Sequence, residues 1–282
     1  MTCISLQEFE MTDEKPVRQF DEHHFIIMKD HCHGLKNDTK IYRYMRLSAL
    51  LDMIYYKVMH VPNMQDFTDL REKKGLKKII EQETSLYKFP NFKISAVPSY
   101  REILYIKRKE KERLRALSVC VSCWTLDKRR NNENDENFLM WKAYSKDDMV
   151  CRIGTTIGQL INSIKKTNHD IIISDVDYNN KVEMSEFESL IFKKSIHYED
   201  EQEVRMVVLS DKRAGIDLQI DIPKLLNEIK ISPFIPPVLS SFILWQLKTW
   251  CKNLENIKID YSNVMEYVET NKNYKSRTNS RL

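Results

Sequence analysis

The stretch KSIHYEDEQEVRMVVL, which runs from Lys194 to Leu209, contains the strand on which the fold prediction rests. Residues 203–210, which begin in this stretch and extend one residue beyond it, are rich in β-branched side chains and predict a strand. Side chains alternate between the two faces of an extended chain, so Glu201, Glu203 and Arg205 are expected to project to one side. Burying such charges without partners is costly. This face is therefore expected either to line a cleft or to form a buried ion-pair network.

Other segments place further strands and helices around this one. Residues 117–124, LSVCVSCW, predict a second central strand, with Ser122 and Trp124 on the same face. Residues 40–46 predict an earlier strand, which a helix at residues 47–56 follows directly. Further strands are expected at 25–29, 57–61, 170–178 and 257–261, and further helices at 64–116, 155–166, 182–194 and 236–252. The last helix is expected to bury a stripe at positions 239, 243, 247 and 250.

The order of these elements favours one fold class. Strands and helices mix without a regular βαβ rhythm, which is typical of an α+β fold with a mixed or antiparallel sheet core and flanking helices. We expect an N-terminal extension at residues 1–40, a single α+β core at residues 41–268, and a basic flexible tail at residues 269–282. The tail carries Lys and Arg but no acidic residue after Glu269, so it is a candidate contact for nucleic acid.

The composition excludes several classes of protein. With only 5 glycines, the chain matches neither collagen nor a glycine-rich phosphate loop. The net charge of +4 is too small to imply nucleic acid binding by itself. No apolar run approaches the roughly 20 residues needed to span a bilayer, and the acidic N-terminus lacks the features of a secretory signal. We expect a cytoplasmic protein without membrane contact, whose cysteines are reduced thiols.

Three clusters of reactive side chains are better explained without a binding site. The histidines and Cys32 between His23 and His33 could bind zinc, but their spacing matches no closed four-ligand pattern, and a solvated segment is favoured. Cys120 and Cys123 would face opposite sides of a strand and could not hold one ion together. The charge run at residues 107–115 is interrupted by acids and favours a solvated helix. No Asp/Glu/His cluster suits a metal-dependent nuclease.

Aromatic side chains gather around the end of the second predicted central strand. Trp124 ends this strand, and Trp141 and Tyr144 follow the polar loop at residues 128–137. Such rings could form a stacking pocket for a ligand, or they could belong to the hydrophobic core. The pattern alone leaves both open.

Together these residues resemble the bacterial family called domain of unknown function twenty-nine seventy-one. The resemblance runs from about Ile41 to about Val264, which is most of the chain. It is carried by the following residues: Tyr42-Arg43-Tyr44, Leu50-Leu51, Phe67-Thr68-Asp69, Ser122-Cys123-Trp124, Met140-Trp141 with Tyr144, Val176 with Tyr178, Lys194, Glu201 to Arg205, Pro233 to Pro237, and Tyr261-Ser262. In one place the chain departs from the family, because Leu70 stands where the family tends to have proline.

The layout of this family is similar to that of ADP-ribosyltransferases, which implies a related fold and NAD as co-substrate. The early-strand arginine, Arg43 or alternatively Arg46, would clamp the pyrophosphate. Glu203 would hydrogen-bond the ribose 2′-hydroxyl and stabilise an oxocarbenium-like centre. Glu201 would orient or deprotonate the acceptor, and Ser122 would hold the nicotinamide ribose.

The resemblance also assigns aromatic residues and partners. Trp141 or Tyr144 would stack on the nicotinamide, and Tyr44 and Trp124 complete the expected NAD-binding set. The implied protein is an ADP-ribosyltransferase, a toxin or antiphage defence effector that modifies RNA, DNA or protein, for which a neutralising antitoxin is a candidate partner. The alternative from another class is a non-catalytic binding module whose Glu201/Glu203/Arg205 strand is a structural charge network.

Overall fold

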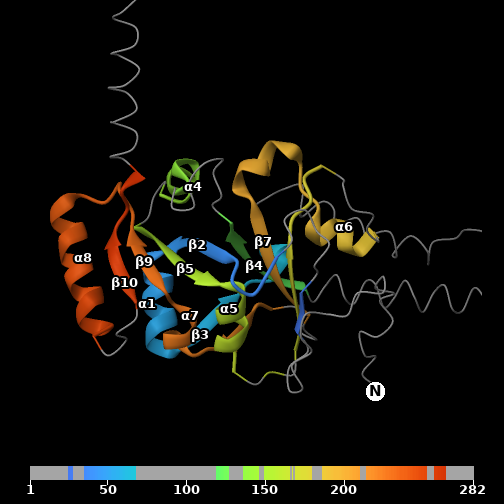
Figure 1. Cartoon of the computed structure of the whole chain (residues 1–282), viewed down its shortest axis with the longest axis horizontal. Coiled ribbons are helices and arrows are strands. Elements are labelled where there is room, and N and C mark those ends of the chain that lie inside the picture. Colours follow the sequence, from blue (N-terminus) through green and yellow to red (C-terminus); the bar gives the residue numbers. More distant parts are fainter. Residues whose placement is uncertain are drawn as a thin grey trace, which may run out of the picture.

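The computed structural model shows an α+β fold built on one large sheet (Figure 1). It describes residues 25–27, 35–67, 119–126, 136–145, 149–165, 167, 169–179, 186–209, 214–252 and 257–264. The large sheet has eight strands in the order β1-β6-β7-β4-β2-β5-β9-β10, and β3 and β8 form a separate two-stranded sheet. Only the two outermost pairs of the large sheet are parallel, so the predicted mixed, mainly antiparallel core is confirmed.

The elements follow one another along the chain with these bounds. The strands are β1 Phe25–Ile27, β2 Lys40–Arg46, β3 Val58–Val61, β4 Val119–Thr125, β5 Val150–Thr156, β6 Asp170–Asp175, β7 Glu203–Leu209, β8 Ile216–Gln219, β9 Glu228–Ile231 and β10 Lys258–Tyr261. The α-helices are α1 Leu47–Tyr56, α4 Phe138–Tyr144, α5 Ile157–Ser163, α6 Glu186–Phe192, α7 Ile222–Leu225 and α8 Pro237–Trp250, and the 3₁₀ helices are η2 Met64–Asp66 and η4 Ile196–Glu201.

The large sheet consists of two halves that are joined by little strand pairing. All of β2 pairs with β5, and all of β4 pairs with β7. Between β2 and β4, in contrast, the only register pair is Tyr42 with Thr125. The other end of β4 is bridged by the segment after β3, where the backbone N–H of Val121 donates to the carbonyl of Pro62 at 2.9 Å. The middle of β4 therefore faces an opening between the two halves.

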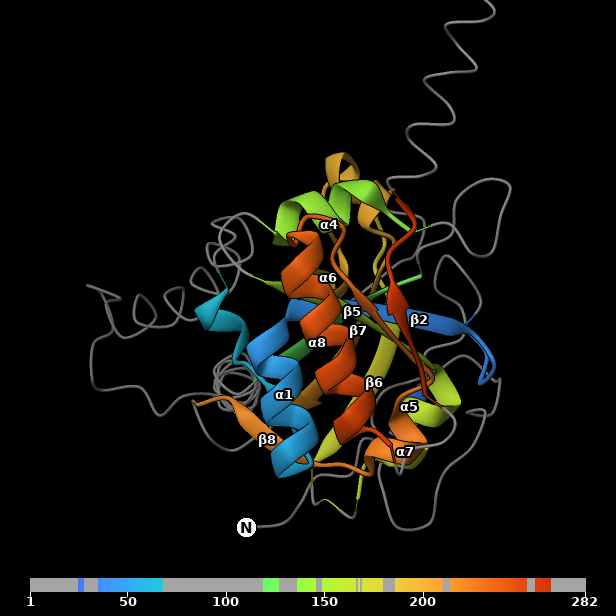
Figure 2. The same cartoon turned by 90° about the vertical axis from the view of Figure 1, so that its left-hand side faces the viewer.

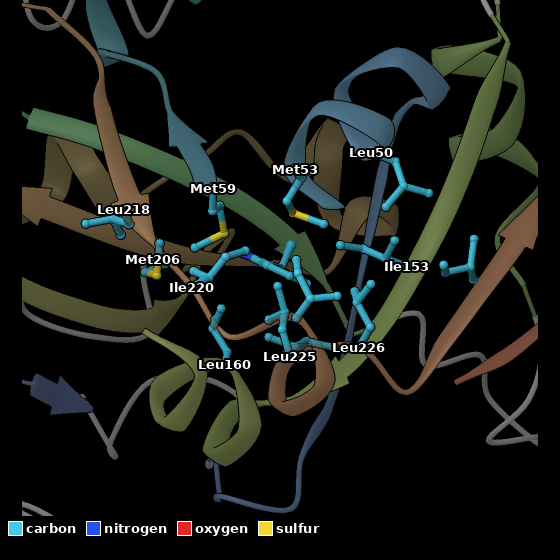
Figure 3. Close-up of a cluster of buried hydrophobic side chains, with 14 of the residues drawn as sticks. Leu50, Met53, Met59, Ile153, Leu160, Met206, Leu218, Ile220, Leu225 and Leu226 are labelled. Atoms are coloured by element: carbon cyan, nitrogen blue, oxygen red, sulfur yellow. The ribbon is translucent and has the colours of Figure 1, made fainter. Parts of the chain in front are cut away.

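One face of the sheet carries the main hydrophobic core. Helices α1, α5 and α7 lie below the sheet in Figure 1, α8 packs at its side, and α4 lies above it. Leu50, Met53 and Leu160 point from the helices toward the strand residues Ile153 and Met206 (Figure 3). Figure 2 shows α8 at the outside of this layer, next to α1. Smaller apolar clusters under α4 and α6 cover parts of the opposite face. No described helix combines the length and apolarity needed to cross a membrane.

Several predicted elements are confirmed, with ends that lie within a few residues of the predicted ones. The strand at residues 40–46 and the helix at 47–56 have the predicted bounds, and β4 and β7 are paired on both sides. Thr156 caps α5 through a hydrogen bond from the Gln159 N–H at 3.2 Å, and this helix ends at Ser163 and not at residue 166. Other predicted segments lie outside the described residues. They are the histidines and Cys32 between His23 and His33, most of the predicted helical region at 64–116 with its charge run at 107–115, and the tail from residue 269.

Several features differ from the prediction, which gave no element at α4, β8, α7 or β9. The pattern gave no strand at residues 150–156, but β5 lies between β2 and β9, and nearly all its side chains are buried, so it shows no polar alternation. In α8 the buried face is centred one position away from the predicted stripe. Ile243 and Leu247 are buried as expected, whereas Leu239 and Trp250 are exposed at 39% and 48%.

Adjacent positions of α8 provide a test of this packing. Ile243 belongs to the main core, while Phe242 is 59% exposed on the outer side. We expect Ile243→Ala to lower the free energy of unfolding by about 2–5 kcal/mol, because it removes buried contacts and leaves a cavity. Phe242→Ala is the matched control and should change it by less than about 0.5 kcal/mol. Urea titrations of both variants give these values, and a larger loss for Phe242→Ala would show that the helix is rotated.

Candidate functional site

A pocket of about 1030 Å³ opens where the two halves of the sheet diverge. Its walls come from β2, β4 and the start of β7, together with α4, η4 and the segment from His60 to Phe67. Among the predicted site residues, the lining includes Arg43, Tyr44, Trp124, Tyr144, Glu201 and Glu203, as well as the alternative arginine Arg46. Residues far apart in the sequence and predicted to act together therefore meet at one pocket.

The opening gives the pocket access to side chains from both faces of the sheet. Thr125 is the register partner of both Tyr42 and Glu203, so these three side chains share one face. Arg43 belongs to the other face, where its guanidinium lies 5.9 Å from the centre of the Trp124 ring. In an intact sheet these two sets would be separated by the backbone. Here they line the same space.

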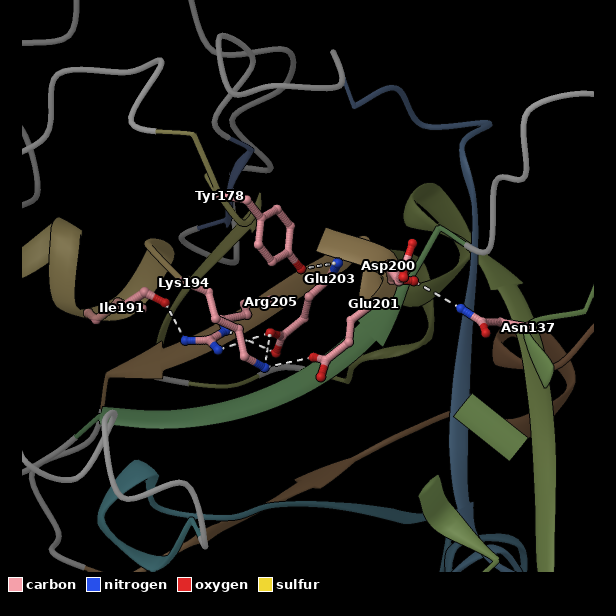
Figure 4. Close-up of polar contacts among 8 residues, drawn as sticks. All are labelled: Asn137, Tyr178, Ile191, Lys194, Asp200, Glu201, Glu203 and Arg205. Carbon is pink, nitrogen blue, oxygen red and sulfur yellow. Dashed lines mark hydrogen bonds and ion pairs between the residues drawn. The ribbon is translucent and has the colours of Figure 1, made fainter. Parts of the chain in front are cut away.

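A network of buried and partly buried charges lines part of the pocket (Figure 4). Arg205 donates to both carboxylate oxygens of Glu203, from Nε at 3.0 Å and from Nη2 at 2.9 Å. Lys194 Nζ bridges the two carboxylates, at 2.7 Å from Glu201 Oε2 and 3.3 Å from Glu203 Oε2. The side chains of Glu203 and Arg205 are only 5% and 1% exposed, so this is a buried ion pair that also borders a pocket.

The network fixes the charge of its members. Although burial acts to raise it, the positive charges of Arg205 and Lys194 hold the pKa of Glu203 down to about 2. Burial raises the pKa of Glu201 above its usual value, against the opposing effect of Lys194. Glu203 is therefore a permanent negative charge at neutral pH, and Glu201 binds a proton more readily than an ordinary glutamate.

Neighbouring groups hold this network in place. The Arg205 Nη1 donates to the carbonyl of Ile191 at 2.6 Å, which ties the network to the end of α6. The backbone N–H of Glu203 donates to the hydroxyl of Tyr178 at 2.9 Å. The thiol of Cys123, the register partner of Arg205, also hydrogen-bonds the Glu203 side chain. These contacts leave the carboxylate little freedom to reorient.

A second buried carboxylate positions α4 beside the pocket. Glu136 accepts hydrogen bonds from the Trp141 Nε1 at 2.8 Å, from Lys230 and from Ser262. Asn137 caps α4 and also donates from Nδ2 to the carbonyl of Asp200 at 2.9 Å, which links the helix to η4. The helix is thus anchored on both sides, and its Tyr144 side chain is 45% exposed at the pocket.

Arg43 lines the pocket and forms no ion pair with a carboxylate among the described residues. Its side chain is partly exposed, and burial lowers its pKa from the ordinary value. A guanidinium remains protonated at neutral pH even so. Arg46, three residues later, is exposed. Of the two predicted arginines, Arg43 is therefore better enclosed to hold an anion.

Three of the predicted site residues lie in a different setting from the one expected. Glu201 does not continue the strand, because η4 ends at this residue and Gln202 has a left-handed backbone with φ of 42°. Its carboxylate reaches the network through Lys194 instead. Ser122 is fully buried on the core side and accepts a hydrogen bond from Trp124 Nε1 at 3.0 Å. Trp141 is fully buried too, with its ring 4.9 Å from that of Tyr44, so it is a core residue.

Sequence reasoning missed several residues of the site. On β4 the residues that face the network are Cys123 and Thr125, but no alternation revealed this because both faces of the strand are covered. For Lys194 the sequence offers only the family resemblance, and no periodicity links this residue to Glu201, seven residues later. Glu136 lies at the end of a stretch whose polarity predicts a solvated loop, yet its side chain is buried.

Within the described residues, no group of three or more His, Cys, Asp or Glu is placed to hold a metal ion.

Comparison with known proteins gives no relatives, since no protein-family model, no curated protein and no solved structure matches the chain. The resemblance stated from the motif residues therefore stays a prediction.

The buried ion pair predicts a measurable effect on stability. Glu203→Gln leaves the buried Arg205 guanidinium without its carboxylate, which should cost about 3–5 kcal/mol at pH 7. Since the pKa of Glu203 is lowered from 4.5 to about 2, its contribution is complete above pH 4.5 and is lost as the pH falls toward 2. The stability difference between wild type and variant should therefore shrink over this window in denaturant titrations.

The matched control is Glu199→Gln, because Glu199 is exposed in the same stretch of chain. It should leave the stability unchanged at every pH. Equal stability of wild type and Glu203→Gln at pH 7 would mean that the ion pair does not form in solution.

Proposed function

We propose that this chain is an NAD-dependent ADP-ribosyltransferase that binds NAD between β2 and β4. The observation that carries the proposal is that one pocket joins Arg43, several aromatic rings and the carboxylates of Glu201 and Glu203. NAD offers the complementary groups, namely a pyrophosphate dianion, two aromatic rings and two riboses. The pocket volume of about 1030 Å³ also lies at the upper end of the range for small-ligand sites, so it leaves room for the donor and part of an acceptor.

The charge state of the carboxylates suits the bond cleavage of this reaction. When the bond between nicotinamide and ribose breaks, positive charge develops on the ribose ring, as in glycoside hydrolysis. A carboxylate that is held ionised and fixed in orientation stabilises that charge without having to reorganise. Glu203 has these properties, since Arg205 and Lys194 keep it ionised and Tyr178 and Cys123 fix its surroundings. It is correspondingly unsuited to accept a proton.

Other residues of the pocket take roles in NAD binding. Arg43 would hold the pyrophosphate, and Tyr44, Trp124 and Tyr144 border the space for the rings. Cys123 and Thr125, rather than Ser122, form the wall beside Glu203. The acceptor is RNA, DNA or protein, and the protein acts as a toxin or antiphage effector inside the cell, with a neutralising antitoxin as a candidate partner.

A second candidate is a non-catalytic binding module, because the Glu203–Arg205 pair is buried in the manner of a structural network. The stability of Glu203 variants does not distinguish the two functions, since this carboxylate belongs to both the network and the pocket wall. Residues that line the pocket outside the buried pair are better probes. Arg43 is such a residue.

The proposal predicts that wild-type protein binds NAD and releases nicotinamide. Arg43→Gln should weaken NAD binding about 10- to 100-fold, the usual effect of losing a hydrogen bond to a charged group. Arg46→Gln is the matched control and should have a smaller effect, because Arg46 is exposed. Calorimetric titration gives the affinities, and chromatography measures free nicotinamide.

The acceptors offered are RNA, DNA and lysate protein. If folded wild-type protein neither binds NAD nor releases nicotinamide with any of them, the proposal is wrong. Binding without any nicotinamide release or label transfer would favour the binding module instead.

A further inference from the structure

A histidine paired with a carboxylate lies at the edge of the same pocket. His60 in β3 and Asp217 in β8 are register partners in the two-stranded sheet, and His60 Nδ1 lies 2.7 Å from Asp217 Oδ1. Both side chains are about two thirds exposed, at 65% and 66%. His60 lines the pocket. The pair was not detected in the sequence, because the two residues are 157 positions apart.

The surroundings of the ring fix both its orientation and its tautomer. A carboxylate accepts hydrogen bonds, so pairing with Asp217 favours the tautomer with the proton on Nδ1 and a lone pair on Nε2. Gly215 adjoins the ring, and a Cβ atom on this residue would lie only 2.8 Å from Cε1 and 3.0 Å from Nε2. No described residue forms a hydrogen bond with Nε2. The result is a basic nitrogen that is held in place and open to a ligand.

Both carboxylates of the pocket are bound by cations, so a base that is free of such a partner has to come from elsewhere in the pocket. Glu203 is bound on both oxygens by Arg205 and is too weak a base to take a proton at neutral pH. Glu201 forms an ion pair with Lys194 at 2.7 Å. A macromolecular acceptor has to approach from solvent, and an exposed residue at the edge of the pocket can reach it there. His60 meets this requirement, and the buried Glu203 does not.

We infer that His60 is the general base that activates the acceptor, and that Asp217 is the positioning residue that orients it. This inference rests on the proposed function. In the step, the hydroxyl or amine of the acceptor gives its proton to His60 Nε2 and forms a bond to the anomeric carbon of the nicotinamide ribose. The bond from this carbon to the nicotinamide nitrogen breaks, and its electron pair stays on nicotinamide, which leaves as a neutral molecule. The bond to nicotinamide breaks first, and Glu203 stabilises the positive charge on the ribose until the acceptor forms its bond to the same carbon.

The test compares label transfer from NAD by wild type, His60→Ala and Asp217→Asn, with total RNA, genomic DNA and lysate protein offered separately. We expect His60→Ala to lower the rate of transfer by about 10²- to 10⁴-fold, the usual contribution of a general base. NAD affinity and melting temperature should not change, because the ring is exposed. Added imidazole should restore part of the activity of His60→Ala, since it can take the place of the missing ring. Asp217→Asn should lose a smaller factor, and imidazole should not restore it.

The matched control is His197→Ala, because His197 is an exposed histidine of η4 that does not line the pocket. It should keep wild-type transfer. If wild type transfers label and His60→Ala does so equally fast, or if imidazole does not restore activity, the role of His60 is wrong and the proposed function stands. If wild type transfers no label and releases no nicotinamide, the proposed function is wrong and the role of His60 is wrong with it.

Discussion

The divergence of β2 from β4 is the constraint on which the site depends. Each strand keeps full pairing with its outer neighbour, and Tyr42 with Thr125 is the one register pair between them. Each half of the sheet is thus complete in its own pairing, and an opening is left where a continuous sheet would have placed backbone. Side chains from both faces reach this opening, which is why Arg43 and Glu203 line one pocket although they project from opposite faces.

The charged network is a consequence of that opening. A carboxylate at the start of β7, next to the opening and only 5% exposed, would be too costly to keep ionised without partners. Arg205 supplies two hydrogen bonds from the same strand, and Lys194 supplies a third from the chain before η4. The sequence left a cleft and an ion-pair network as alternatives for this face. The structure combines them, because the network itself forms part of the pocket wall. A group can therefore be needed for stability and for ligand binding at once.

The sequence predicts those parts of the fold whose two faces differ. The strand at residues 40–46 and the helix that follows were predicted with their bounds, because polar and apolar positions recur there with a clear period. The sequence-based prediction fails at β5, because nearly all side chains of this strand are buried and no alternation marks it. It also fails at Ser122, because both faces of β4 are covered and the pattern does not say which face meets the pocket. Pairs such as His60 with Asp217 depend on strand register between distant segments, which a single sequence does not contain.

NAD is proposed to occupy the space next to Glu203, and Cys123 can report directly on whether it does. This thiol is partly exposed at the pocket, whereas Cys120, Cys151 and Cys251 are buried. The measurement is the rate of alkylation of each cysteine by iodoacetamide, followed by peptide mass spectrometry with and without saturating NAD. If NAD binds there, it should strongly slow the alkylation of Cys123 and leave the slow reaction of the buried thiols unchanged. Alkylation of Cys123 at the same rate with and without NAD would contradict this proposal.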